Sequence, residues 1–191
     1  MFEVDTPAQE EPLVQLSHVF VEFDKLQVLR DVSVDIYRGE FVVLHGDTGC
    51  GKSTVLRLIA GLLNPSRGAV RVAGEDVQDF STLQRRWLRR AIGLMLPNSL
   101  LLEDRSILEN VMLPALAAEA STEQARQQAL AALSRCHMSD WAYNYPIDLS
   151  SGQRQQVSLA RAVVNQPVLI LADEPAAHLD ANNAQTVINL L

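Results

Sequence analysis

A short glycine-rich run has the residue types and the spacing of a loop that binds phosphate. Its members are Gly46, Asp47, Thr48, Gly49, Cys50, Gly51, Lys52, Ser53 and Thr54. The apolar run at 41–44 predicts a strand before it, and an apolar-periodic segment predicts a helix after it. The glycines let successive N–H groups point at one phosphate, and the helix N-terminus adds partial positive charge. Lys52 can reach the β- and γ-phosphates, and the Ser53 hydroxyl suits Mg²⁺. The run therefore predicts binding of a nucleoside triphosphate.

Two carboxylates follow a second apolar run. The segment 168–172 is apolar and leads directly to Asp173 and Glu174, which is typical of a strand in the middle of a sheet. Acids at the C-terminal end of such a strand lie where open α/β sheets bind ligands. Asp173 is suited to hold Mg²⁺, directly or through water, and Glu174 to orient or deprotonate the attacking water. Alternatively both acids only begin a loop and cap a helix; their combination with the glycine loop favours the catalytic role.

A second glycine-bearing segment begins a predicted helix. It consists of Leu149, Ser150, Ser151, Gly152 and Gln153. Small residues at a helix start form an anion site, although Ser-Ser-Gly is also an ordinary helix N-cap. A long helical stretch separates this segment from the glycine loop, which predicts that it serves a second nucleotide.

The composition excludes several classes of protein. With 48% hydrophobic residues among 191, the chain can build one sizeable domain with a subdomain. Its formal net charge of −7 argues against a broad face for nucleic acid. No apolar run approaches the ~20 residues of a membrane span, and the acidic start excludes a secretory signal. The 2 cysteines are too few for a disulfide framework, so we expect a cytosolic protein.

Three further features allow both a functional and a purely structural interpretation. Cys50 is either a redox-sensitive thiol or a small residue that the loop tolerates, and the second interpretation is preferred. The run 100–102 is either an exposed docking patch or part of a core. The arginines at 85, 86, 89 and 90 either touch anionic lipid head groups or form a solvated helix face, which is the commoner case.

Apolar patterns along the chain predict an α/β nucleotide-binding core with an all-helical insertion. After an acidic tail over 1–12, strands are predicted at 13–16, 28–37, 41–44, 69–72, 91–96 and 168–172. The stretch 98–160 has helical patterns and no convincing strand. One of its helices begins at Ser121, with a capping box completed by Gln124.

Taken together, these segments resemble the ATP-binding-cassette (ABC) ATPases over nearly all of residues 13–191. Residues 46–54 match the Walker A motif, 149–153 the ABC signature and 168–174 the Walker B motif. His178, Leu179 and Asp180 match the D-loop, and Phe23 stands where the family has an aromatic that stacks on adenine. The resemblance implies a P-loop NTPase with an N-terminal antiparallel β subdomain. It also implies a helical subdomain over about 98–160.

Within this family, three stretches resemble the bacterial cell-division ATP-binding proteins of the FtsE type: 88–93, 101–106 and 160–167. Lipoprotein-release and macrolide-efflux ATPases share much of the pattern. The resemblance implies ATP hydrolysis with Mg²⁺ in a head-to-tail homodimer. In it, Ser150 and Gly152 of one subunit complete the γ-phosphate site on Lys52 of the other. It further implies a peripheral position on the cytoplasmic face of the inner membrane, beside an integral permease subunit of the FtsX type.

The chain departs from the family pattern at several positions. Pro97 replaces the Q-loop glutamine and offers neither a side-chain acceptor nor an N–H, which leaves Asn98 as a substitute. Ser151 replaces the first signature glycine, and Ala176 and Ala177 replace a threonine and a small polar or glycine residue. Because the sequence stops before the family's final strand and switch histidine, we expect a C-terminally incomplete cassette.

These observations leave several functions open. A division ATPase is the leading hypothesis, and a motor for lipoprotein release or efflux is a rival of the same class. A rival from another class is a tether that binds nucleotide with little or no ATP turnover. The replacement of the Q-loop glutamine by Pro97 favours this tether. A soluble DNA-repair or chromosome-clamp ATPase is disfavoured by the acidic charge.

Overall fold

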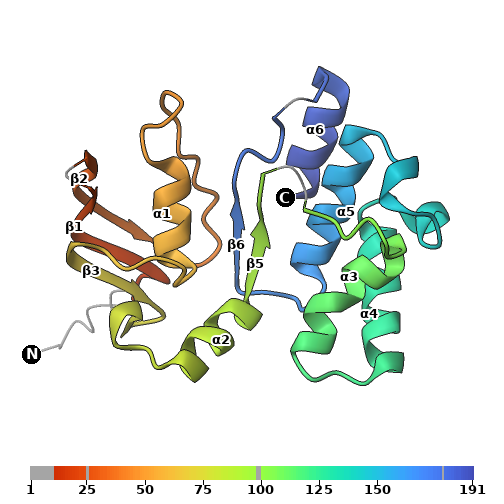
Figure 1. Ribbon diagram of the computed structural model, residues 1–191, viewed down its shortest axis with the longest axis horizontal. Coiled ribbons are helices and arrows are strands. Elements are labelled where there is room, and N and C mark those ends of the chain that lie inside the picture. The colour runs from red at the N-terminus through yellow and green to blue at the C-terminus, as the bar shows by residue number, and fades with distance from the viewer. Residues whose placement is uncertain (1–10, 25, 98–99, 178) are drawn as a thin grey trace, which may run out of the picture. The chain divides into compact units, whose positions relative to one another are not determined.

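The computed structural model describes residues 11–24, 26–97, 100–177 and 179–191 (Figure 1). They form two compact units, one ending at Arg85 and the other running from Arg86 to Leu191. Most of the predicted acidic tail lies outside the described residues, as do Asn98 and His178. Within the described ranges, no helix has the length and apolar character needed to cross a membrane.

The N-terminal unit contains a four-stranded antiparallel sheet in the order β2-β1-β3-β4 (Figure 1). Its strands are β1 (Val14–Phe23), β2 (Leu26–Ile36), β3 (Arg67–Val72) and β4 (Glu75–Asp76). Along β1 the buried positions change from 14 and 16 to 19 and 21. The register with β2 shifts between Leu16 and Val19, so a bulge keeps the apolar side chains on one face. The strands predicted around 13–16, 28–37 and 69–72 are confirmed.

Two helices accompany this sheet along the chain. Helix α1 (Lys52–Ile59) buries Val55, Leu58 and Ile59. A 3-10 turn, η1 (Val77–Asp79), then leads to α2 (Thr82–Ala91), within which the boundary between the two units falls.

The strand predicted at 41–44 is wrong. Residues 40–46 form no strand, and the Phe41 and Val43 side chains are 66% and 68% exposed. A strand needs a neighbour that pairs with its backbone N–H and C=O groups. The sheet of the N-terminal unit pairs its four strands only with one another, so the run has no strand partner among the described residues.

The C-terminal unit contains a two-stranded parallel sheet. Strands β5 (Ile92–Met95) and β6 (Leu169–Ala172) pair from Ile92 opposite Leu169 to Met95 opposite Ala172. Gly93 lets β5 approach the neighbouring helix closely, because a Cβ there would lie 2.6 Å from the Ala162 carbonyl oxygen. The strands predicted around 91–96 and 168–172 are confirmed.

Helices make up the rest of this unit. They are α3 (Ile107–Ala117), α4 (Thr122–Arg135), α5 (Ser151–Val163) and α6 (Ala181–Leu190), with 3-10 turns η2 (Ser139–Trp141) and η3 (Pro146–Asp148). The capping box predicted at Ser121 is confirmed, since Ser121 and Gln124 exchange backbone and side-chain hydrogen bonds. The predicted bounds of a helical subdomain, about 98–160, stay a prediction.

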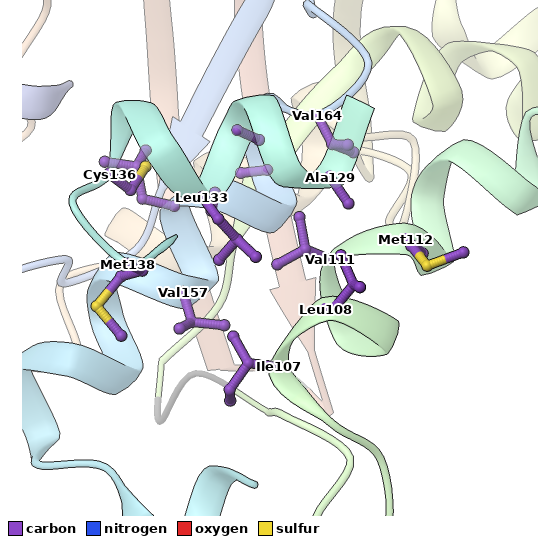
Figure 2. Packing of buried hydrophobic residues seen from close by; sticks show 14 of the residues in the cluster. Ile107, Leu108, Val111, Met112, Ala129, Leu133, Cys136, Met138, Val157 and Val164 are labelled. Atoms are coloured by element: carbon purple, nitrogen blue, oxygen red, sulfur yellow. The ribbon is translucent and has the colours of Figure 1, made fainter. Parts of the chain in front are cut away.

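The core of the C-terminal unit lies between α3, α4 and α5. Ile107, Val111, Leu133 and Val157 are fully buried and point toward one another (Figure 2). The 100–102 run is divided: Leu101 belongs to this core, whereas Leu100 and Leu102 are exposed. The run is therefore neither wholly a core segment nor wholly an exposed patch.

Candidate nucleotide site

The glycine-rich run forms a loop that leads into α1. Gly49 and Gly51 have φ values of +83° and +101°, a left-handed conformation that residues with a Cβ rarely adopt. A Cβ on Gly51 would also lie 2.6 Å from Leu29 Cδ2 and 3.2 Å from the Val28 carbonyl oxygen. Glycine is thus required at position 51 both for its conformation and for close packing on β2.

Helix α1 begins at this loop without a side-chain cap. Its N-cap is Gly51, and no side-chain cap hydrogen bond forms there among the described residues. The first N–H groups of a helix carry the positive end of its dipole. This end of α1 therefore favours an anion.

The Lys52 side chain folds back over the loop. Its Nζ donates hydrogen bonds to the carbonyl oxygens of Gly46 (2.8 Å) and Asp47 (2.9 Å). The Cys50 Sγ lies 3.8 Å from the same nitrogen, and this cysteine is free and exposed. Because both oxygen acceptors are neutral carbonyls, the ammonium keeps its full charge for a phosphate. The structure thus places residues 46–54 in one loop and helix start that carries the Lys52 ammonium.

Phe23 also belongs to the N-terminal unit. It is the last residue of β1, and its side chain is 46% exposed. An exposed ring at a strand end can stack on a planar base.

Asp173 and Glu174 follow the C-terminal end of β6, as predicted. The Asp173 N–H donates to the Met95 carbonyl oxygen at 2.9 Å, which extends the pairing of β5 and β6 by one residue. Asp173 is only 6% exposed, whereas Glu174 is exposed and has a left-handed φ of +49°. Both carboxylates therefore stand at the sheet edge where α/β proteins bind ligands.

The segment 149–153 caps α5. Ser150 Oγ accepts a hydrogen bond from the Gln153 N–H (3.3 Å), and Gln153 Oε1 accepts one from the Ser150 N–H (2.9 Å). Leu149 is buried beside this cap, and Ser151 is exposed. The ordinary N-cap interpretation thus describes the contacts, and a role of this segment toward a second nucleotide stays a prediction.

Asn183 is a residue that the sequence reasoning missed. Gly152 packs against it, since a Cβ on Gly152 would lie 2.7 Å from Asn183 Cγ. Asn183 Nδ2 donates to Asp180 Oδ2 at 2.6 Å, and Asp180 Oδ1 accepts the N–H groups of Asn182 and Asn183 at 3.1 Å each. The hydrogen bonds from Asn183 are the main cause that lowers the pKa of the Asp180 carboxyl. The spacing from Asp180 to Asn183, an N-cap and its third helical residue, was the available signal.

The predicted site residues divide between the two units. Phe23 and the loop 46–54 belong to the N-terminal unit, and the other predicted residues belong to the C-terminal unit.

Ser53 and Asp173 have the donor chemistry that Mg²⁺ requires. A hydroxyl and a carboxylate are hard oxygen donors, and Mg²⁺ commonly takes one or two protein ligands together with phosphates and water. In the described parts of the chain, no group of three or more His, Cys, Asp or Glu could hold a metal ion. Each of the two side chains thus has suitable donor chemistry within its own unit, Ser53 in the N-terminal one and Asp173 in the C-terminal one, and a magnesium site stays a prediction.

This chain is similar in sequence to proteins of known family. The profile of the ABC transporter family matches residues 29–177. The cell division ATP-binding protein FtsE of Escherichia coli strain K12 is 40% identical over 164 residues, which are 86% of this chain and 74% of that protein. The lipoprotein-releasing system ATP-binding protein LolD of Treponema pallidum is 39% identical over 186 residues, which are 95% of this chain and 82% of that protein.

A solved structure is similar as well. It is the dimeric post-hydrolysis state of the ATP-binding cassette MJ0796 bound to ADP and Pi. Its TM-score is 0.84 at 33% identity, with 93% of this chain and 80% of that chain covered. The resemblance and the fold class predicted from the motifs are thereby confirmed. Since the family profile spans the glycine loop, the segment 149–153 and both carboxylates, the chain belongs to the ABC transporter family and is an ATPase.

Proposed function

We propose that the chain is the ATP-binding subunit of a bacterial inner-membrane complex and couples ATP binding and hydrolysis to a membrane partner in cell division. The observation that carries the ATP-binding part is the Lys52 ammonium, held by the Gly46 and Asp47 carbonyls at the uncapped N-terminus of α1. This loop presents a full positive charge and a helix dipole to one anion, which is the chemistry that a triphosphate requires.

Each predicted site residue has a role in this proposal. The loop 46–54 holds the phosphates, and Phe23 stacks on the adenine. Ser53 and Asp173 supply oxygen ligands to Mg²⁺, which offsets charge on the phosphates when bound. Glu174 orients the attacking water or accepts its proton.

Two copies of the chain act together in the proposed cycle. The segment 149–153 of one copy contacts the nucleotide held by Lys52 of the other, and Asp180 lies in the D-loop beside it. Asn183 positions the segment 149–153 and Asp180 relative to each other, because it packs on Gly152 and donates a hydrogen bond to Asp180. The dimeric cassette structure at 33% identity supports this arrangement.

The division role rests on the 40% identity to FtsE. The corresponding partner is a four-span permease of the FtsX type, with the chain on the cytoplasmic face of the inner membrane. A second candidate is the motor of a lipoprotein-release transporter, which the 39% identity to LolD over 95% of the chain supports.

Co-purification separates the two candidates. The chain is co-expressed with an FtsX-type permease or with a lipoprotein-release permease from the same genome, and Lys52→Ala serves as the nucleotide-binding control. We expect ATP-dependent capture by the FtsX-type permease. Capture by the lipoprotein-release permease alone would overturn the division role and leave the ATPase assignment standing.

Phosphate release from the captured complex then tests turnover. We expect release well above that of a Glu174→Gln complex. ATP-dependent capture without such release would instead indicate a tether, the alternative that Pro97 favours.

A further inference from the structure

The C-terminal unit contains a cavity of about 520 Å³ that no proposed nucleotide contact uses. It is lined by the end of α2, strand β5, the end of α3 and the end of α5. Four of its lining residues are arginines: Arg86, Arg89, Arg90 and Arg161. Its volume falls in the range of small-ligand sites, roughly 300–1,000 Å³.

Positive charge in this cavity is only partly neutralised. Arg90 pairs with Glu119 at 3.1 Å, and Arg161 donates to the Leu100 carbonyl oxygen at 2.8 Å. The side chains of Arg86 and Arg89 form no hydrogen bond or ion pair with any described residue. They stand three residues apart on α2, so their charges repel each other across one helical turn. An anion bound between them would remove this repulsion.

Most of the remaining wall of the cavity is apolar, with Asn165 as the polar exception. Ile92, Leu94, Pro114 and Ala162 line it, and Ile92 and Ala162 are nearly fully buried. A cavity with cations and an apolar wall suits an amphiphile better than a fully polar anion, because each part of the ligand leaves water for matching chemistry.

Trp87 supports an amphiphilic ligand. It lies on α2 between Arg86 and Arg89 and is 72% exposed, which is unusual for so large an apolar side chain. Tryptophan is enriched where a protein meets the head-group region of a bilayer, because one end of its ring system is apolar and the other donates a hydrogen bond.

We propose that this arginine cavity binds the head group of an anionic phospholipid. The phosphate lies between Arg86 and Arg89, the first carbons of an acyl chain contact the apolar wall, and Trp87 lies at the bilayer interface. This inference does not depend on the division role or on ATP binding. It replaces the solvated-helix interpretation of these arginines with a specific ligand site.

Vesicle binding without nucleotide tests the proposal. The 191-residue chain is sedimented with phosphatidylcholine vesicles, with and without added phosphatidylglycerol. We expect binding only to the anionic vesicles. Arg86→Gln/Arg89→Gln should weaken it about 25-fold, since each basic residue near an anionic surface contributes about fivefold.

A matched control is available on α4. Arg126→Gln/Arg135→Gln removes the same charge from two exposed positions outside the cavity and should bind the anionic vesicles as the parent does. An equal loss of vesicle binding in both double variants would show that binding depends only on general charge attraction, and it would overturn the proposed site. Equal binding of both variants, or no vesicle binding, would also overturn it.

Two further arms identify the ligand and guard against misfolding. In the Trp141→Phe variant, brominated phosphatidylglycerol should quench Trp87 fluorescence, and inorganic phosphate at the same phosphate concentration should not displace the vesicles. Displacement by phosphate alone, or selective binding of a glutamate-rich peptide in place of lipid, would contradict a lipid site. Circular dichroism confirms that each variant is folded.

Discussion

At the scale of single residues, the proposed nucleotide site depends most directly on Lys52. Lys52→Ala removes the ammonium but leaves Gly51 and the start of α1 in place. We expect ATP affinity to fall roughly 30- to 150-fold, because a charge-assisted contact in a partly dry site contributes about 2–3 kcal/mol. Isothermal titration calorimetry measures this loss. Arg57→Ala removes an exposed cation from the last turn of the same helix and should bind ATP normally. Unchanged affinity in Lys52→Ala would contradict the loop assignment.

Glu174 is the proposed base for the attacking water. Glu174→Gln keeps the size of the side chain but cannot take a proton from water. We expect ATP binding at the parental affinity and loss of phosphate release, measured by a coupled phosphate assay. Glu75→Gln removes an exposed carboxylate of β4 and should leave the rate unchanged. Parental turnover in Glu174→Gln would show that another group is the base.

At the scale of elements, Asn110 ties α3 to the segment that precedes it. Its side chain is fully buried; Oδ1 accepts the Leu102 N–H at 2.8 Å, and Nδ2 reaches the carbonyl oxygens of Leu102, Arg105 and Ser106 at 3.0–3.2 Å. Asn110→Ala leaves these backbone groups without their partner. We expect a loss of about 2–4 kcal/mol in the free energy of unfolding, measured with urea. The exposed Asn189→Ala should stay within about 0.5 kcal/mol of the parent; an equally small change at Asn110 would contradict this interpretation.

Helix α6 should have a pH-dependent start. Hydrogen bonds from Asn183 lower the pKa of the Asp180 carboxyl below its usual value. A lowered folded pKa means that the cap stabilises the protein above the unfolded pKa and is lost as the pH falls through the folded one. We therefore expect Asp180→Ser, which still caps but does not titrate, to lose less stability than the parent between neutral and strongly acidic pH. Urea unfolding across that range measures the difference, and parallel curves would contradict the cap's contribution.

Elements were predictable from the sequence where their determinants are local. The Ser121 capping box involves residues three positions apart, so its helix start was predicted correctly. The run 41–44 has the residue types of a strand, but pairing depends on a distant neighbour, and the structure leaves it unpaired. Asn110 was missed for the same reason, because nothing in its local pattern marks a buried amide.

At the scale of the whole molecule, the sequence predicted the loop and helix of the candidate site but not how its side chains lie. The glycine spacing predicted a loop followed by a helix, and the structure has a left-handed Gly51 and a helix that starts at Lys52. The spacing did not predict that the Lys52 ammonium rests on the Gly46 and Asp47 carbonyls. Side-chain contacts of this kind depend on the three-dimensional path of the backbone. The arginine cavity is similar, since its side chains come from α2 and α5.

The proposed head-to-tail dimer makes a prediction about mixtures of two inactive variants. Lys52→Ala disables the loop, and Ser150→Asp keeps a good N-cap for α5 but places a negative charge against the γ-phosphate. Each variant alone should release little phosphate. Equal mixing puts half of the subunits in mixed dimers, each with one intact site of two, so about a quarter of the parental rate should return. Ser150→Asn, which caps without charge, is the matched control and should stay active alone. Phosphate release measured across mixing ratios checks this, and a mixture no more active than its components would show that the segment 149–153 does not act on the partner's nucleotide.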